Sequence, residues 1–149
     1  MFTKNLFFIG ALFCALLVLG STETSAQVSA ANVLKRASAI VDKLESQKAQ
    51  VLFLQVDNIE KEKISTQTYT LEAGSTYAVV AIGDEERIQD IDLVVVDDEG
   101  EVAGKDTDEA NVAIVKVKSK KTQAYKIGVK GYKMAKNDGF FAIVICRLD

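Results

Sequence analysis

Histidine, tryptophan and proline are all absent from the sequence, and each absence removes a class of function or structure. Without histidine there is no Ser-His-Asp or Cys-His catalysis, no HExxH protease and no histidine-based zinc site. Without tryptophan the chain lacks the commonest platform for stacking sugar rings. Without proline the turns depend on glycine, asparagine and aspartate, and folding has no slow prolyl isomerisation phase. An enzyme of this composition would need a carboxylate pair, a Ser-Lys dyad or a bound metal.

Strong positive charge is also missing. The chain has 149 residues, a formal net charge of −3 and a pI of about 5.1. Binding to nucleic acid requires a basic face that neutralises phosphates, so we expect no nucleic-acid partner. The length is that of one domain, and 48% hydrophobic residues indicate a globular chain.

The start of the chain predicts export. Lys4 precedes an uncharged apolar run from Leu6 to Leu19, which is short for a membrane span of roughly 20 residues but suits a signal peptide. The small residues of Thr24–Ala26 predict cleavage after Ala26, with Gly20 as the alternative. We therefore expect a periplasmic or secreted protein with no membrane span in the mature chain; an uncleaved N-terminal anchor is the other interpretation.

Cysteine is scarce as well, with two in the chain. Cys14 lies inside the apolar run and is not preceded by the small residues typical of a lipoprotein anchor. Cys146 ends the apolar segment Phe140–Cys146 and would be alone in the mature chain. We expect it to be a small buried hydrophobic residue, with a reactive or intermolecular thiol as the alternative.

An amphipathic helix is predicted between Ser29 and about Gln50. Its apolar residues recur at three- and four-residue steps, and Ser29 is a candidate N-cap. The next segment, Val51–Val56, could extend the helix or open the first strand. The charged run Glu60–Lys63 indicates a solvated connection. The main members of the helical stripe are Val33, Ala37, Ile40 and Leu44.

From Ile64 onward the apolar pattern is that of strands separated by turns. The expected strands are 64–71, 77–82, 91–96, 101–103, 112–118, 124–130 and 140–148. The expected turns or loops are Ala73–Gly74, 83–89, 97–100, 104–111 and 137–139. Short strands with turn signals every 8–12 residues are typical of a sandwich or barrel. The predicted fold is therefore mainly β, an antiparallel β-sandwich of about seven or eight strands preceded by the helix. Residues 1–26 are expected to be the signal peptide, 27–63 the helix and connection, and 64–149 the sandwich.

Acidic residues are concentrated in one stretch. Twelve carboxylates lie between Asp84 and Glu109, opposed only by Arg87 and Lys105. Asp90 and Asp92 would lie on one face of a strand and could act in acid/base catalysis, although catalysis also needs a pocket that the sequence does not show. Calcium takes six to eight oxygen ligands and is the natural cation to test here, but the EF-hand spacing is not met. A solvated acidic rim is the simpler interpretation.

Lysines dominate the following stretch, with eight between Lys116 and Lys136 and no acidic residue until Asp138. Several alternate with apolar residues, so we expect them on the outward face of two strands. There they would discourage edge-to-edge aggregation. Binding to an anionic partner is the alternative.

An ordered series of short motifs resembles the bacterial pre-peptidase C-terminal domain. The motifs are Tyr69-Thr70-Leu71-x-Ala73-Gly74-x-Thr76-Tyr77, Asp90-Ile91-Asp92-Leu93, Asp97-x-x-Gly100 with Val102-Ala103 and Asp106, and Tyr125-Lys126-Ile127-x-Val129. The resemblance covers roughly residues 64–147. It implies a jelly-roll β-sandwich of the kind appended to secreted proteases, with collagen-binding modules also similar. Some members bind calcium through aspartates, which implies Asp90, Asp92 and Asp106 as metal ligands here. No peptidase is attached in this chain, and a helix stands in its place.

Three hypotheses about function follow. The first is an exported, non-catalytic binding or accessory module for a protein or polysaccharide ligand. The second is a structural or interaction protein that dimerises or docks through its N-terminal helix. The third is a calcium-stabilised domain that assists a secreted protease.

Overall fold

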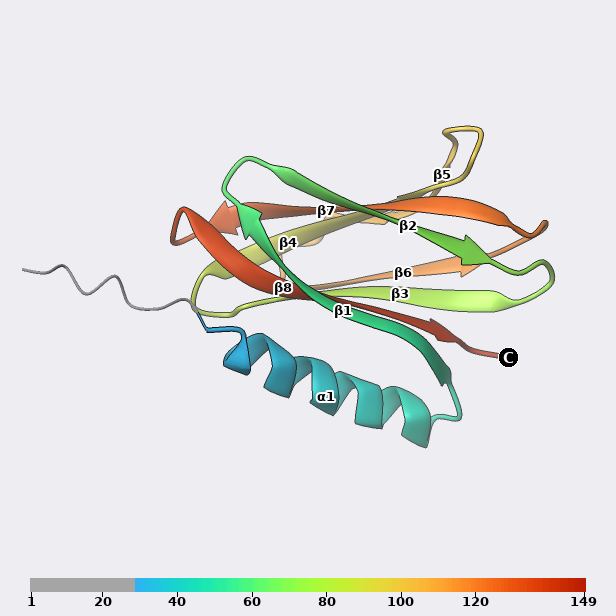
Figure 1. Cartoon of the computed structure of the whole chain (residues 1–149), viewed down its shortest axis with the longest axis horizontal. Coiled ribbons are helices and arrows are strands. Elements are labelled where there is room, and N and C mark those ends of the chain that lie inside the picture. Colours follow the sequence, from blue (N-terminus) through green and yellow to red (C-terminus); the bar gives the residue numbers. More distant parts are fainter. Residues whose placement is uncertain (1–28) are drawn as a thin grey trace, which may run out of the picture.

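Eight strands and one helix make up residues 29–149, the part of the chain that the structure, a computed structural model, describes. The expected export segment, residues 1–26, lies outside this part. The elements in chain order are α1 (Ala31–Ser46), β1 (Gln50–Glu60), β2 (Ile64–Leu71), β3 (Thr76–Gly83), β4 (Ile88–Val96), β5 (Val102–Asp106), β6 (Val112–Lys118), β7 (Gln123–Met134) and β8 (Asp138–Arg147). Figure 1 shows the strands stacked in layers with α1 running beneath them.

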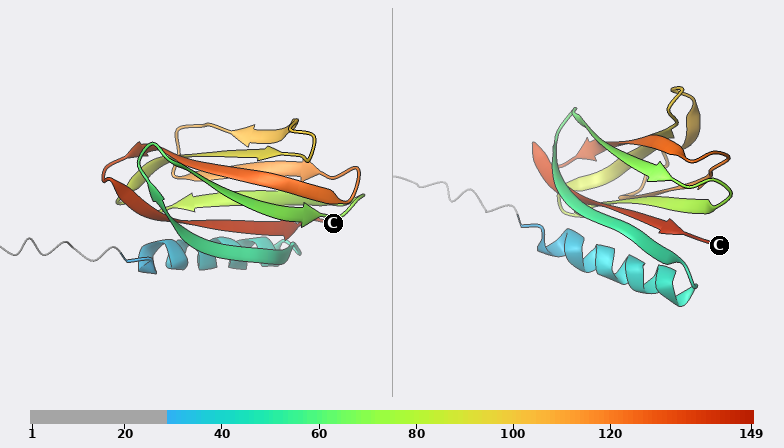
Figure 2. Two further views of the ribbon diagram at one scale, coloured as in Figure 1. Left: turned by 45° about the horizontal axis from the view of Figure 1, so that its top comes forward. Right: turned by 45° about the vertical axis from the view of Figure 1, so that its right-hand side comes forward.

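The strands form two antiparallel sheets of four. The first, which we call sheet A, has the order β1-β8-β3-β6, and the second, sheet B, has the order β2-β7-β4-β5. This is the strand order of a jelly roll, in which successive strands pass back and forth between two sheets. Figure 2 shows the two layers from further directions. The predicted antiparallel β-sandwich with a preceding helix is confirmed.

Alternating side chains fill the space between the sheets. In β6, Val115 and Val117 are buried while Lys116 and Lys118 are exposed, as period-two alternation requires. The largest fully buried side chains of the core include Tyr77 and Phe141. Full burial of one large apolar side chain stabilises the fold by about 1.5–3 kcal/mol, so each of these residues contributes substantially.

Helix α1 covers the outer face of sheet A, so this sheet is buried on that face as well as on the face toward sheet B. Val33 and Ala37 of the helix are fully buried and pack with Val80 of β3 and Val144 of β8. Strands β3 and β8 are therefore buried on both faces, which explains why their sequences are apolar almost without interruption. Of the elements described, α1 is the only helix, and it is neither long nor apolar enough to cross a membrane.

Several expected boundaries are wrong. Segment Val51–Val56 opens strand β1, which pairs along its length with β8, so the sandwich begins at Gln50 and not at residue 64. Strand β4 starts at Ile88 because its first residues pair with the extended end of β7. The short strand expected at 101–103 runs to Asp106 and takes up the start of the expected loop.

Two further details concern the ends of α1 and β8. The N-cap residue of α1 is Ala30 and not Ser29, although the Ser29 hydroxyl accepts a hydrogen bond from the Ala31 N–H at 3.2 Å. The expected burial of Cys146 is confirmed, and burial raises the pKa of its thiol.

Candidate functional site

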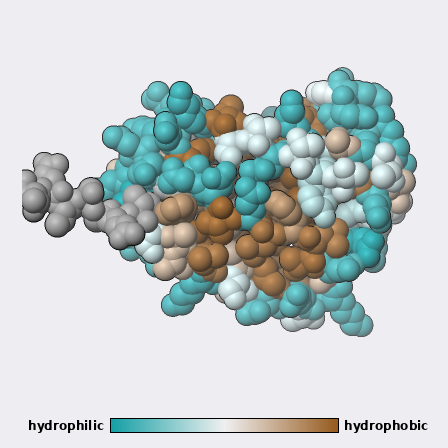
Figure 3. Space-filling view, in the orientation of Figure 1, coloured by the Kyte–Doolittle hydropathy of each residue, from teal (hydrophilic) through white to brown (hydrophobic). Residues whose placement is uncertain are grey.

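The two sheets differ in what covers their outer faces. The outer face of sheet A is covered by α1, whereas no element of residues 29–149 covers the outer face of sheet B. That open face presents a row of exposed threonines from β2, lysines from β7 and the exposed Ile64. Figure 3 shows an apolar region over α1 and β1, the elements that carry the exposed side chains of Leu34 and Leu54. The open face of sheet B contains two adjoining hollows that share Asp92 and Thr107.

An irregularity in strand pairing shapes one end of this face. Asp90 of β4 lies opposite Lys133 of β7, but Ile91 lies opposite Gly131, so the register shifts at this point and Tyr132 is left out of it. Such bulges reorient side chains and are common beside functional sites. Here the irregularity accompanies a strand residue, Asp90, whose carboxyl side chain is buried.

Asp90 is only 4% exposed, and its Oδ1 has no hydrogen-bond donor among the described residues. Buried polar atoms in folded proteins are nearly always paired, because an unpaired one costs about 1–3 kcal/mol. The neighbouring Asp92 is half-buried, and its pKa is raised by burial, then by the charges of Asp90 and Asp106, with Lys130 opposing them. Negative charge is therefore incompletely compensated at this end of β4.

These carboxylates line an open hollow that we call the Asp90 groove. The groove has a volume of about 470 Å³ and is lined by Asp90, Asp92, Thr107, Glu109, Tyr132 and Lys133. The Tyr132 ring is 68% exposed, with the Lys130 ammonium 5.6 Å from its centre. Lys133 is paired with Glu109 at 3.4 Å. Both nearby lysines thus have partners, and no ion pair within residues 29–149 includes Asp90 or Asp92.

An apolar floor continues the groove along sheet B. Asp92 and Thr107 also line a second hollow, whose apolar floor is made by Ile64, Val94 and Gly128 and whose sides include Lys105 and Lys130. A Cβ at Gly128 would lie 3.0 Å from the Val94 Cγ1, so glycine leaves this floor open. The combined surface can hold a charged group at one end and an aliphatic one at the other.

Of the three expected calcium ligands, Asp90 and Asp92 line the groove. Asp106 does not line the groove; its Oδ1 accepts a hydrogen bond from the Asp108 N–H and its Oδ2 one from the Ile114 N–H, at 3.1 and 2.7 Å. Within the described part of the chain, no group of three or more Asp, Glu or Cys side chains could hold a metal ion. Asp90 and Asp92 alone fall well short of six to eight oxygens, so the residues fit calcium poorly. Calcium binding stays a prediction.

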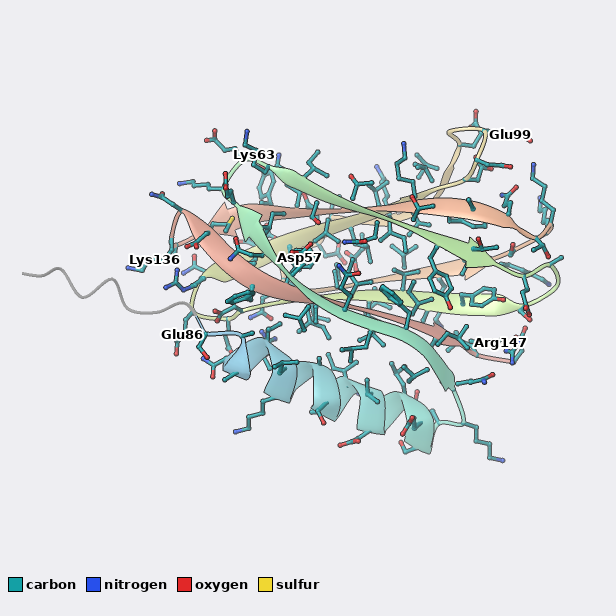
Figure 4. The ribbon with its side chains drawn as sticks, viewed as in Figure 1. Asp57, Lys63, Glu86, Glu99, Lys136 and Arg147 are labelled. Atoms are coloured by element: carbon teal, nitrogen blue, oxygen red, sulfur yellow. The ribbon has the colours of Figure 1, made fainter. Side chains whose placement is uncertain are left out.

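The acidic stretch is divided between the two ends of the sandwich. Figure 4 places Glu86 at one end, near Lys136, and Glu99 at the other, at the tip of the β4–β5 turn. At that tip, the Lys121 ammonium pairs with Glu99 at 2.7 Å and with Asp98 at 3.3 Å. The twelve carboxylates therefore do not form one continuous rim.

The lysines are divided too. Lys116 and Lys118 point outward from sheet A, whereas Lys126 and Lys130 belong to sheet B and point away on the opposite side. The expectation that lysines line the outward face of two strands holds, but the two strands lie in different sheets. They do not make a single basic surface for an anionic partner.

Sequence reasoning found Asp90 and Asp92 but missed the rest of the groove. Tyr132 lies beyond the expected end of its strand, and Thr107 and Glu109 lie in the loop that follows β5. A signal was present at Tyr132, since an aromatic residue stands there at an outward position of β7, where Lys126 and Lys130 occupy the earlier outward positions.

Comparisons with solved structures bear on the fold. No protein-family model and no curated protein sequence matches the chain. The pre-peptidase C-terminal domain of a collagenase from Bacillus anthracis is similar in structure, with a TM-score of 0.50, 11% identity, and coverage of 62% of this chain and 87% of that domain. A periplasmic inhibitor of g-type lysozyme from Aeromonas hydrophila is also similar, with a TM-score of 0.50, 12% identity, and coverage of 66% and 87%. The resemblance to pre-peptidase C-terminal domains is thus confirmed at the level of the fold.

Proposed function

We propose that this protein is an exported, non-catalytic binding module whose partner is another exported protein, a hydrolytic enzyme in the first instance. The observation that carries the proposal is the asymmetry of the sandwich. Helix α1 seals sheet A, while sheet B keeps an open face with a groove, an exposed tyrosine and an apolar floor. Exposed aromatic side chains beside apolar area and isolated charges are typical of surfaces that bind proteins.

The two structural neighbours support this choice of partner. One is a domain of a collagenase and the other inhibits a lysozyme, so each is associated with a hydrolytic enzyme and neither is named as a catalytic domain. The apolar run Leu6–Leu19 and the small residues before Gln27 support export. The absence of histidine from the whole sequence supports a non-catalytic role.

The alternative of docking through the helix has less support. Its apolar stripe is used within the molecule, because Val33 and Ala37 are fully buried against sheet A. A second chain could use the stripe only if α1 left the sheet and exposed Val80 and Val144. The energetic cost of that exposure favours a docked helix.

The test is a binding and turnover assay with the purified protein. We expect saturable binding to g-type lysozyme by biolayer interferometry and slower lysis of cell walls by that lysozyme. Binding to purified peptidoglycan without binding to lysozyme would replace the protein partner by a polysaccharide. Cleavage of peptide or glycan substrates by the protein itself, lost in Asp92→Asn, would overturn the non-catalytic assignment.

A further inference from the structure

We infer that the Asp90 groove is a recognition site for a basic side chain, an arginine or lysine, presented by the protein partner. This inference rests on the proposed function and names the chemistry that the partner brings to sheet B. It is argued from the carboxylates of β4, the exposed ring of Tyr132 and the apolar floor beside them.

The first argument is the uncompensated carboxylate. Asp90 lines the groove while 96% of its surface is removed from solvent, and its Oδ1 receives no hydrogen bond from residues 29–149. Asp92 adds a second carboxylate on the same strand, and Asp106 lies near enough to raise its pKa. A buried charge without a partner is costly, and a cation placed between Asp90 and Asp92 would offset that cost. A neutral ligand could donate hydrogen bonds to these carboxylates but would bring no positive charge to balance them.

The second argument is that no cation of the described residues makes an ion pair with Asp90 or Asp92. The Lys133 ammonium is 3.4 Å from Glu109, and the Lys130 ammonium lies over the Tyr132 ring. Neither makes an ion pair within 4.0 Å with Asp90 or Asp92 in the described part of the chain. Lys130 lies opposite Asp92 and lowers its pKa from a distance, but the position in direct contact with the two aspartates is not taken by a cation of the described residues.

The third argument concerns shape. Arginine and lysine end in a cation carried on an aliphatic stem. The groove offers acidic side chains for the cation and, next to them, apolar surface for the stem. The carboxylates of Asp90 and Asp92 would take the head group, with the Tyr132 ring beside it to stack on a guanidinium. The floor formed by Ile64, Val94 and Gly128 begins at Asp92 and would take apolar atoms of the same or the next partner residue.

A small-molecule titration tests this assignment without knowing the partner. N-acetyl-arginine amide is added to the purified protein, and the ring signals of Tyr132 and the carboxyl signals of Asp90 and Asp92 are followed by NMR. The matched probe is N-acetyl-citrulline amide, which has nearly the same shape and no charge. We expect saturable shifts at these three residues with the arginine compound, and affinity for the citrulline compound weaker by about tenfold or more.

Three variants separate the groove from a general charge effect. Asp90→Asn keeps the size of the side chain, and Tyr132→Leu alters an exposed residue that the core does not need. Both should weaken arginine binding by about tenfold, while Asp42→Asn, an exposed carboxylate on α1, should not change it. Equal loss in Asp42→Asn, or equal binding of both probes, would overturn the inference.

The remaining arms distinguish other ligands. Saturable shifts at Asp90 with calcium chloride, in the absence of any with arginine amide, would make the groove a metal site and overturn the inference. Shifts with chitotriose alone would make it a sugar site, with the same consequence. Arginine binding without any binding to lysozyme would support the groove as a site for a basic side chain and overturn lysozyme as the partner. Lysozyme binding that Asp90→Asn leaves unchanged would support that partner and overturn the role of the groove.

Discussion

The guanidinium of Arg36, in the middle of α1, donates a hydrogen bond of 2.7 Å to the Asn111 Oδ1 at the entrance to β6. A second nitrogen of the same group donates to the Gly83 carbonyl at the end of β3. One helical side chain thereby connects α1 to two segments that are far apart in the sequence. The helix is fixed to sheet A by this polar contact as well as by its apolar stripe.

Replacement of this side chain should loosen the helix. Arg36→Ala removes both charged hydrogen bonds and leaves the Gly83 carbonyl without its donor, so we expect a loss of about 1–3 kcal/mol in the free energy of unfolding. Urea denaturation measures the loss, and hydrogen exchange should speed up first in α1. The matched control is Lys35→Ala, an exposed neighbour, with a change within about 0.5 kcal/mol. Equal effects of the two substitutions would show that the contact contributes nothing.

A hydroxyl pair in the core gives a second prediction. The Tyr125 hydroxyl lies 3.2 Å from the Ser119 Oγ, and both residues are buried. Tyr125→Phe should lower the free energy of unfolding by about 1 kcal/mol because this hydrogen bond is lost. Tyr132→Phe removes the same atom from an exposed ring and should change stability by less than about 0.5 kcal/mol. Identical urea midpoints for the two variants would contradict the role of the buried pair.

The close approach of β5 to β6 can be tested with a compensating pair. A Cβ added at Gly104 would collide with the Cγ1 of Val115. Gly104→Ala should therefore destabilise the fold by about 1–3 kcal/mol. Adding Val115→Ala makes room, so the double variant should lose less than the sum of the single ones. Strict additivity in thermal unfolding would show that the two residues do not meet.

The raised pKa of Asp92 predicts a dependence of stability on pH. The folded protein holds this proton more tightly than the unfolded chain, whose pKa is near the ordinary 3.8, so stability falls as pH rises from 3.8 through the raised pKa and stays reduced above it. Asp92→Asn should be more stable than the natural chain at pH 7, by less than about 1 kcal/mol at this partly solvated position. The advantage should vanish below pH 3.8. Asp42→Asn is the control, and a gain of equal size there would contradict the local origin of the effect.

Calcium gives the fifth prediction. Because Asp106 is bound to its own loop and does not line the groove with Asp90 and Asp92, we expect calcium to leave the melting temperature unchanged. The measurement compares the purified protein in millimolar calcium and in EDTA by differential scanning fluorimetry. A ligand that binds only the folded state raises its apparent stability, so a melting temperature several degrees higher in calcium would restore the metal site that the sequence resemblance implies.

Local sequence patterns predicted the fold correctly where the alternation of side chains within one strand is enough to show which of them are buried. Strict alternation in β6 identified both its state and its buried face, since side chains on a strand alternate whatever its neighbours are. The ambiguous segment Val51–Val56 could not be assigned in the same way. Its strand state depends on pairing with β8, which is separated from it by six other strands along the chain, and on α1 packing against it.

The Asp90 groove could not be predicted from local sequence patterns, because it too depends on contacts between segments that are distant in the sequence. Asp90 and Asp92 were visible as a pair on one strand, but Tyr132 joins them only through a shift of register between β4 and β7. Burial of Asp90 likewise depends on that register. Asp106 was grouped with them by resemblance, yet its carboxylate is held by backbone N–H groups of its own loop and of β6.

Strand β8 follows β1, β3 and β6 along the chain, yet it lies between β1 and β3 in the middle of sheet A. A chain truncated before Asp138 has no strand to pair with β1 and leaves one edge of β3 without its hydrogen-bond partner. Sheet A is therefore held together by the strand that follows all of its other members along the chain, and loss of residues 138–147 should leave β1 separated from the pair of β3 and β6.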